Sequence, residues 1–130
     1  MDPVVHFELP ADDRDRAAAF YAAAFGWEIE KLGGEMGDYT LVTTTETQAG
    51  RPVRPGEING GIYPRDDSGR SQTPRVVIAV GDAEAAVARI EAAGGRVEQG
   101  IHDIPGVGRY AWFSDSEGNR MSVLEPAPRS

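Results

Sequence analysis

The chain repeats part of its own sequence at an interval of 69 residues. Residues 13–30 (DRDRAAAFYAAAFGWEIE) align without a gap on residues 82–99 (DAEAAVARIEAAGGRVEQ), with six identities. The shared Asp is typical of a helix start, and the shared Gly is typical of a helix end. A repeat of this length predicts two copies of one supersecondary unit, which restricts the fold to duplicated architectures.

Strand patterns surround each predicted helix. Residues 4–9 alternate apolar and polar side chains, and residues 76–80 form the matching strand before the second helix. Three more strands are predicted in each copy, at residues 27–31, 38–44 and 57–63 and at residues 96–101, 109–114 and 120–125. Residues 33–34, 49–56 and 103–108 are predicted to be turns or loops.

These elements give two modules of the order strand, helix and three strands. The first module spans residues 1–63, residues 64–74 form a linker, the second module spans residues 75–126, and residues 127–130 form a tail. One helix covers only one face of a four-stranded sheet. We therefore expect an α+β fold in which two curved mixed sheets, placed in tandem, enclose a cleft between their concave faces.

The composition of the chain argues against several classes of protein. The chain has 13 basic and 21 acidic residues and a net charge of −8, whereas nucleic-acid binding needs clustered basic residues. There is no cysteine, which excludes disulfides and thiolate metal sites and suits a reducing compartment. No long apolar run is present, so neither a signal peptide nor a membrane span is expected. We predict a cytoplasmic protein.

Three segments together resemble a known superfamily. ELPADD at residues 8–13, AFYAAAFGW at residues 19–27 and AWFSDSEGNRMSVLE at residues 111–125 resemble the vicinal oxygen chelate superfamily of glyoxalase I, extradiol dioxygenases and bleomycin-resistance proteins. Ser116 stands where the family has Pro. NGGIYPR at residues 59–65 and IPGVGRYAWF at residues 104–113 resemble a bacterial glyoxalase-related subgroup. The resemblance implies tandem βαβββ modules and a homodimer.

The resemblance also defines four positions for metal ligands. Metal-dependent members hold a divalent ion through the first and fourth strands of each module. The matching residues here are His6, Gly60, Arg75 and Ser122. A guanidinium group only donates hydrogen bonds, and a catalytic metal needs about three protein ligands. Only His6 matches a ligand position, so we expect no metal or other cofactor. Non-standard divalent-metal sites remain open, either His6 with Glu8 and Glu57 or a site that uses Glu125.

Strand alternation provides candidates for ligand binding. It places Tyr110 and Trp112 on the cavity face, because Ala111 and Phe113 suit the core better. The complete set of candidates is His6, Glu8, Trp27, Tyr39, Arg75, Tyr110, Trp112 and Ser122. Trp27 and Trp112 can equally serve packing. An ion pair between Glu8 and Arg75 is expected, because it would neutralise two buried charges.

Three functions are compatible with this sequence. The first is a metal-free, small-molecule-binding protein similar to bleomycin-resistance proteins, whose ligand is cationic or aromatic. The second is a glyoxalase-type lyase, isomerase or dioxygenase that uses a divalent metal or takes His6 or Glu8 as its general base. The third is a non-catalytic interaction module. The sequence identifies neither a substrate nor whether one chain or a dimer completes the cleft.

Overall fold

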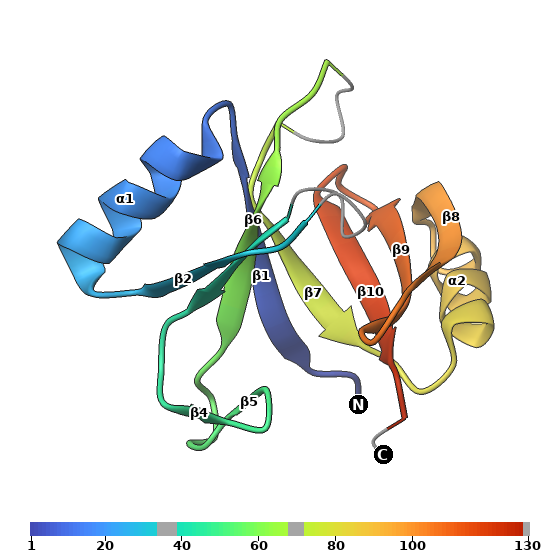
Figure 1. Ribbon diagram of the computed structural model, residues 1–130. Helices are drawn as coiled ribbons and strands as arrows, with labels where there is room; N and C mark the ends of the chain where they lie inside the picture. Colours follow the sequence, from blue (N-terminus) through green and yellow to red (C-terminus); the bar gives the residue numbers. More distant parts are fainter. Residues whose placement is uncertain (34–38, 68–71, 129–130) are drawn as a thin grey trace. The chain divides into compact units, whose positions relative to one another are not determined.

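The computed structural model describes residues 1–33, 39–67 and 72–128, which form two compact units. The first unit contains residues 6–74, and the second contains residues 75–130 together with residues 1–5 (Figure 1). Parts of four predicted segments lie outside the described residues, namely the turn at Gly34, the strand start at Asp38, residues 68–71 of the linker and residues 129–130 of the tail.

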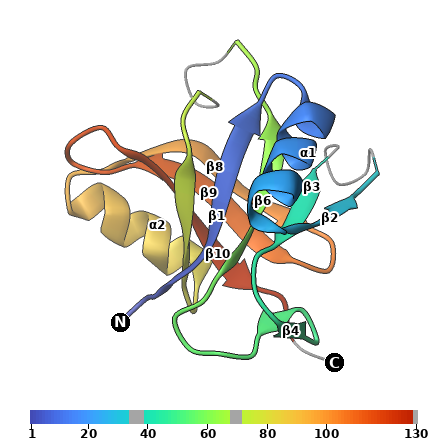
Figure 2. The same ribbon diagram turned by 90° about the vertical axis from the view of Figure 1, so that its left-hand side faces the viewer.

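The first unit is a four-stranded mixed sheet with one helix. Its elements are β1 (Val4–Ala11), α1 (Arg14–Phe25), β2 (Glu28–Lys31), β3 (Thr40–Thr43) and β6 (Asn59–Pro64). The strand order is β2-β3-β6-β1, and β1 and β6 are parallel whereas the other neighbours are antiparallel. Helix α1 contacts β2, β3 and β6 (Figure 2).

The loop predicted at residues 49–56 contains strand structure instead. Residues Thr47–Gln48 (β4) and Arg51–Pro52 (β5) pair as a short antiparallel ribbon. Ala49 and Gly50 connect them with φ angles of 52° and 77°, the conformation of a two-residue hairpin turn. The Pro- and Gly-rich composition concealed this ribbon, because both residues usually indicate irregular structure.

The second unit has the same arrangement. Its elements are β7 (Arg75–Ala79), α2 (Ala83–Ala92), β8 (Arg96–Ile104), β9 (Gly108–Ser114) and β10 (Arg120–Pro126). The strand order is β8-β9-β10-β7, with only β7 and β10 parallel. The α+β class and the duplicated βαβββ order are therefore confirmed. The predicted loop at residues 103–108 is too long, because β8 continues to Ile104 and β9 begins at Gly108.

The repeated Asp residues start both helices. The side chain of Asp13 accepts a hydrogen bond from the backbone N–H of Arg16 at 3.0 Å, and Asp82 accepts one from Ala85 at 3.1 Å. Such bonds satisfy amide groups that a first helical turn leaves without partners. At the end of α1, Gly26 has a φ of 74°, which is the left-handed conformation that favours glycine.

Each unit has its own core on the helix-facing side of its sheet. The first core contains Ala11, Ala18, Val42 and Ile62, and the second contains Val80, Ala86, Ala111, Phe113 and Val123. Ala111 and Phe113 are core residues as the alternation predicts, so the neighbouring side chains of β9 project to the opposite face. Within the described residues, neither helix is long and apolar enough to cross a bilayer.

Candidate functional site

The strand registers relate the two units residue by residue. Glu8 pairs with Gly61 in the first unit, and Val77 pairs with Ser122 in the second. Val77 is the repeat equivalent of Glu8, 69 positions later. The residue equivalent to Ser122 is therefore Gly61. The assignment of this fourth-strand position to Gly60 is therefore wrong by one residue. It rests on counting a fixed number of residues from the turn glycine before the strand, and the connection from that glycine to β6 is longer than the corresponding connection to β10.

The two glycines face opposite sides of the sheet. A Cβ atom added to Gly60 would meet the ring of Phe7, which packs on the helix-facing core. A Cβ atom added to Gly61 would instead meet the hydroxyl end of Tyr39. The Tyr39 hydroxyl thus occupies the space into which a fourth-strand side chain would project in this unit.

A hydrogen-bonded network joins three predicted site residues in the first unit. The Tyr39 hydroxyl donates to Glu8 Oε2 at 3.1 Å and lies 3.2 Å from His6 Nε2. His6 and Glu8 share this face because they are two residues apart on β1. Tyr39 has a single hydroxyl proton, so His6 is the donor in their bond. We call His6, Glu8 and Tyr39 the first cluster.

Burial sets the charge state of His6. Removal from water lowers the pKa of its imidazole from 6.5 to about 4, because burial disfavours the charged form. His6 is therefore neutral at pH 7. A neutral ring protonated at Nε2 fits the bond to Tyr39. The lowered pKa also makes His6 a weak base near neutrality.

A second tyrosine lies at the equivalent position in the second unit. Leu41 pairs with Gly61 and Trp112 pairs with Ser122, so Tyr39 and Tyr110, each two residues earlier, correspond. The Tyr110 hydroxyl donates to Ser122 Oγ at 2.7 Å. Both units therefore bring a phenol to the fourth-strand position, although the surrounding residues differ.

The second cluster contains Arg75, Tyr110, Trp112 and Ser122. Trp112 Nε1 donates to the Tyr110 hydroxyl at 3.0 Å. The guanidinium carbon of Arg75 lies 3.8 Å from the centre of the Trp112 ring, in a cation–π contact, and its Nη1 donates to the carbonyl of Met121 at 3.2 Å. Arg75 is only 3% exposed and Ser122 is fully buried.

Trp27 and His102 belong to neither cluster. Trp27 stacks on Tyr21, with ring centres 4.7 Å apart and an interplanar angle of 8°, and it packs on the core below α1. The structure does not bring Trp27 to the first cluster, and its role in binding stays a prediction. His102 is half-buried, and its ring lies edge-on to Tyr110 with the ring centres 5.6 Å apart. Register shifts in β8 between Val97 and His102 interrupt the alternation of the strand. For this reason the sequence pattern does not indicate that His102 lies beside Tyr110.

The other two acidic candidates, Glu57 and Glu125, have their partners outside both clusters. Glu125 accepts a hydrogen bond from the backbone N–H of Ala83, the first residue of α2, at 2.9 Å. Glu57 binds Arg54 and Thr45 in the loop before β6. Among the described residues, the one close group of three carboxylate or imidazole ligands is Asp82, Glu84 and Glu125.

That acidic group already has a cationic partner. Arg109 forms a two-point ion pair with Glu84 and holds the pKa of this carboxyl down at about 2. The alternative site of His6, Glu8 and Glu57 does not form a close group among the described residues. The predicted cleft and the predicted pair of Glu8 with Arg75 depend on how the two units sit together, and they stay predictions.

Comparisons with known proteins agree with the duplicated fold. Residues 4–123 match the sequence model of the family described as the Glyoxalase/Bleomycin resistance protein/Dioxygenase superfamily. CFP32 of Mycobacterium tuberculosis, provisionally named a glyoxylase, is 36% identical over 126 residues, which cover 94% of this chain and 43% of CFP32. The anthracycline biosynthesis protein DnrV of Streptomyces peucetius is 30% identical over 90% of this chain and 44% of its own length. This chain thus spans less than half the length of these relatives.

Solved structures show the same fold at lower identity. Methylmalonyl-CoA epimerase from Streptomyces coelicolor, solved in complex with 2-nitronate-propionyl-CoA, superposes with a TM-score of 0.69 at 19% identity, covering 96% of this chain and 97% of that one. The epimerase from Mycobacterium tuberculosis gives a TM-score of 0.67, also at 19% identity, and covers 96% of this chain and 88% of that one. At this level of identity the likeness concerns the fold alone.

Proposed function

Because the chain belongs to the Glyoxalase/Bleomycin resistance protein/Dioxygenase superfamily, we propose that it binds a small organic molecule on the polar faces of its sheets. We define these as the faces that carry the first and second clusters, opposite the helices. We propose further that binding needs no divalent ion. The observation that carries this proposal is the set of side chains at the family's four ligand positions.

Those four positions do not fit a divalent ion. With the corrected register they are His6, Gly61, Arg75 and Ser122. They supply one imidazole, no side chain, a group that only donates hydrogen bonds and a neutral hydroxyl. A catalytic ion needs about three protein ligands and an open position. These side chains therefore do not fit the metal-dependent chemistry of the family.

The two clusters contain groups that can contact an organic ligand directly, without a metal ion. The first cluster contains a phenol, a neutral imidazole and a carboxylate, and the second contains a phenol, an indole and a guanidinium. Their part-exposed members are His6, Tyr39 and Trp112. Aromatic rings with polar ends are suited to binding flat ligands that also form hydrogen bonds. These groups support a direct contact with the ligand in place of one mediated by an ion.

We propose a flat aromatic ligand, preferably one with a positive charge. Tyr39 and Trp112 are part-exposed and provide aromatic surface, and the net charge of −8 attracts cations to the molecule. The name of DnrV as an anthracycline biosynthesis protein supports a polycyclic aromatic class. The chain spans less than half of that relative's length.

Thermal-shift measurements on chelator-treated protein test this proposal. The panel contains planar aromatic cations, neutral aromatic compounds and aliphatic amines. A bound ligand raises the melting temperature by mass action, and aromatic cations are expected to give the largest shift. The proposal is overturned if every aromatic compound leaves the melting temperature unchanged up to millimolar concentration.

A tyrosine pair provides the matched variants for that measurement. Tyr39→Phe should weaken binding about five- to tenfold, because a hydrogen bond contributes roughly 1 kcal/mol. Tyr21→Phe is the control, since Tyr21 stacks on Trp27 in the core on the helix-facing side of the first sheet. Equal affinities of the two variants would contradict a role of the first cluster.

The second candidate is a metal-independent enzyme that transfers a proton. The bond between Tyr39 and Glu8 favours Glu8 as the base, because the lowered pKa of His6, about 4, makes the imidazole a poor proton acceptor at pH 7. Turnover by chelated protein that disappears in Glu8→Gln would support this candidate. A stoichiometric divalent ion that is lost in His6→Ala would instead favour the metal-dependent glyoxalase type.

A further inference from the structure

The hydroxyl proton of Tyr39 is used inside the first cluster. Tyr39 donates it to Glu8 Oε2 at 3.1 Å, and Glu8 is only 8% exposed, so the proton is directed at a buried acceptor. A phenol has a single proton to give. The Tyr39 oxygen, on a side chain that is half-buried, can therefore only accept hydrogen bonds from a ligand.

The imidazole of His6 is committed in the same way. Its Nε2–H donates to the Tyr39 oxygen at 3.2 Å, and the ring is neutral at pH 7 because burial lowers its pKa to about 4. A neutral imidazole with its proton on Nε2 has an acceptor at Nδ1. Within residues 1–33, 39–67 and 72–128, no hydrogen-bond donor reaches that nitrogen. His6 is half-buried, so its Nδ1 is an acceptor for a ligand.

The side chains of the first cluster therefore present only acceptors to a ligand. The cluster contains an imidazole nitrogen, a phenol oxygen and a carboxylate, and each polar proton that these side chains carry is bonded within the cluster. A carboxylate accepts hydrogen bonds and donates none. Such a surface does not suit a ligand that presents carbonyl or carboxylate oxygens, because acceptors would face acceptors. It suits a ligand that donates.

The second cluster has the opposite character. The repeat equivalents of His6 and Glu8 are Arg75 and Val77, so a guanidinium group replaces the imidazole and an apolar side chain replaces the carboxylate. A guanidinium group is positively charged and only donates. A ligand that donates through a cationic group would meet like charge there, so its chemistry distinguishes the first unit from the second.

We propose that the ligand of the first cluster is a flat aromatic cation that carries its charge on N–H groups, such as an amidinium or a protonated amino-heterocycle. This inference rests on the proposed binding of an aromatic molecule and adds which chemical group of it the protein recognises. The N–H groups donate to His6 Nδ1 and to the Tyr39 oxygen. Glu8 is a positioning residue, because it holds the Tyr39 proton away from the ligand. Its charge also stabilises the cation.

Benzamidine and phenyltrimethylammonium are matched probes for this proposal. Both are aromatic cations at pH 7, but only benzamidine has N–H groups. In calorimetric titrations of chelator-treated protein, benzamidine should bind at least about tenfold more tightly, because hydrogen bonds from charged donors are strong. Equal affinities, or tighter binding of phenyltrimethylammonium, overturn the proposal. If neither probe binds but neutral aromatic compounds raise the melting temperature, this inference fails and the proposed function stands. If no aromatic compound binds, both fail.

The Glu8→Gln variant tests the positioning role. An amide group can donate as well as accept, so the Tyr39 proton is no longer held by a group that only accepts. The preference for benzamidine over phenyltrimethylammonium should fall to about twofold or less. Tyr39→Phe removes the acceptor oxygen from a side chain of nearly the same shape and should reduce the preference as well. Equal weakening of both probes in these variants would indicate a merely structural role and would overturn the proposal.

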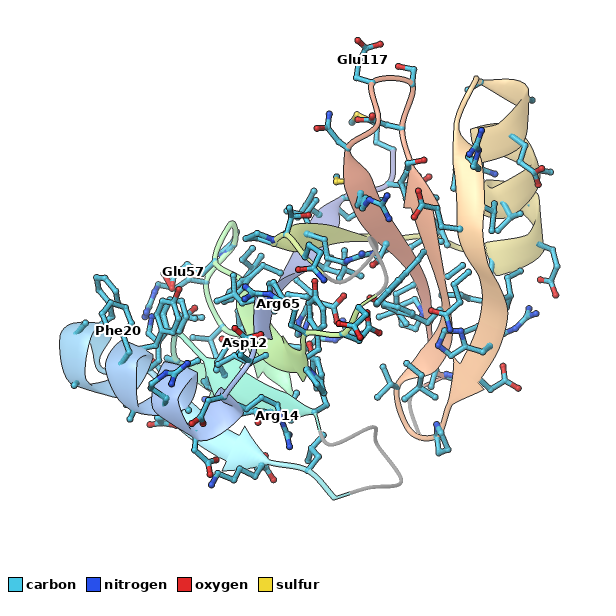
Figure 3. The ribbon with its side chains drawn as sticks, turned by 90° about the horizontal axis from the view of Figure 1, so that it is seen from above. Asp12, Arg14, Phe20, Glu57, Arg65 and Glu117 are labelled. Carbon is cyan, nitrogen blue, oxygen red and sulfur yellow. The ribbon has the colours of Figure 1, made fainter. Side chains whose placement is uncertain are left out.

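The Glu117→Gln variant is the charge-matched control. It removes the same negative charge as Glu8→Gln, and Glu117 is exposed. Figure 3 shows its side chain at the tip of the turn between β9 and β10, where it projects outward. This variant should keep the full preference for benzamidine. An equal loss of preference in Glu8→Gln and Glu117→Gln would show that the net charge selects the cation, which overturns the assignment to the first cluster.

Discussion

Gly61 is the residue on which the first cluster depends most directly. It pairs with both Glu8 and Leu41 in the sheet, and its missing side chain leaves space for the end of Tyr39. A larger residue at this position would have to displace the phenol. The bonds from Tyr39 to His6 and Glu8 would then be lost together.

The Gly61→Ala variant should therefore be less stable. The added methyl group collides with the tyrosine ring, and such overpacking costs about 1–3 kcal/mol. Urea unfolding measures this loss. Gly33→Ala is the control, because a Cβ atom at Gly33 meets no atom within 4 Å and its φ is not in the left-handed region. Equal unfolding free energies for the two variants would show that Tyr39 does not need this space.

His6 should make stability depend on pH. Its pKa is about 4 in the folded chain and 6.5 without burial, so between these values the unfolded state binds more protons. Stability should then decrease as the pH falls from about 6.5 to 4, and it should be fully present above that window. Urea unfolding at pH 7 and pH 4.5 should show a smaller decrease for His6→Gln than for the unmodified chain. A decrease of the same size in both proteins would indicate that other groups cause it.

Among the elements, the helix starts were the most predictable. The repeated Asp predicts both N-termini, and the structure places Asp13 and Asp82 there because their side chains bind free amide groups. The turn before β10 is also determined by local contacts. In that turn, the Asp115 carboxylate accepts hydrogen bonds from Glu117 and Asn119, and Gly118 has a φ of 82°. Local hydrogen bonding decides all three cases, so a short window of sequence was sufficient.

The cap of α1 gives a prediction for one element. Asp13→Ala should lower the unfolding free energy by about 1 kcal/mol, because the amide of Arg16 loses its acceptor. Asp13→Asn keeps an acceptor oxygen and should stay close to the unmodified chain. Chemical denaturation of the three proteins measures the difference. Equal losses in both variants would point to the charge of Asp13 instead of its hydrogen bond.

Other elements depend on contacts that a short window does not contain. The β4–β5 ribbon has strands of two residues, too short for any periodic pattern. The register shifts in β8 bring His102 to Tyr110 against simple alternation. The position of Gly61 follows from the pairing of β1 with β6, which a count along the chain does not determine. Long-range pairing and bulges therefore account for most of the differences.

At the scale of the whole molecule, the duplication predicts the fold of both units but not the function of each unit. Strand order and directions agree between the units, although most residues in the aligned helices differ. Tyr39 and Tyr110 keep equivalent positions, whereas His6 corresponds to Arg75 and Phe20 corresponds to Arg89. Backbone topology tolerates such exchanges on surfaces and polar faces, because it depends mainly on the apolar residues of the two cores.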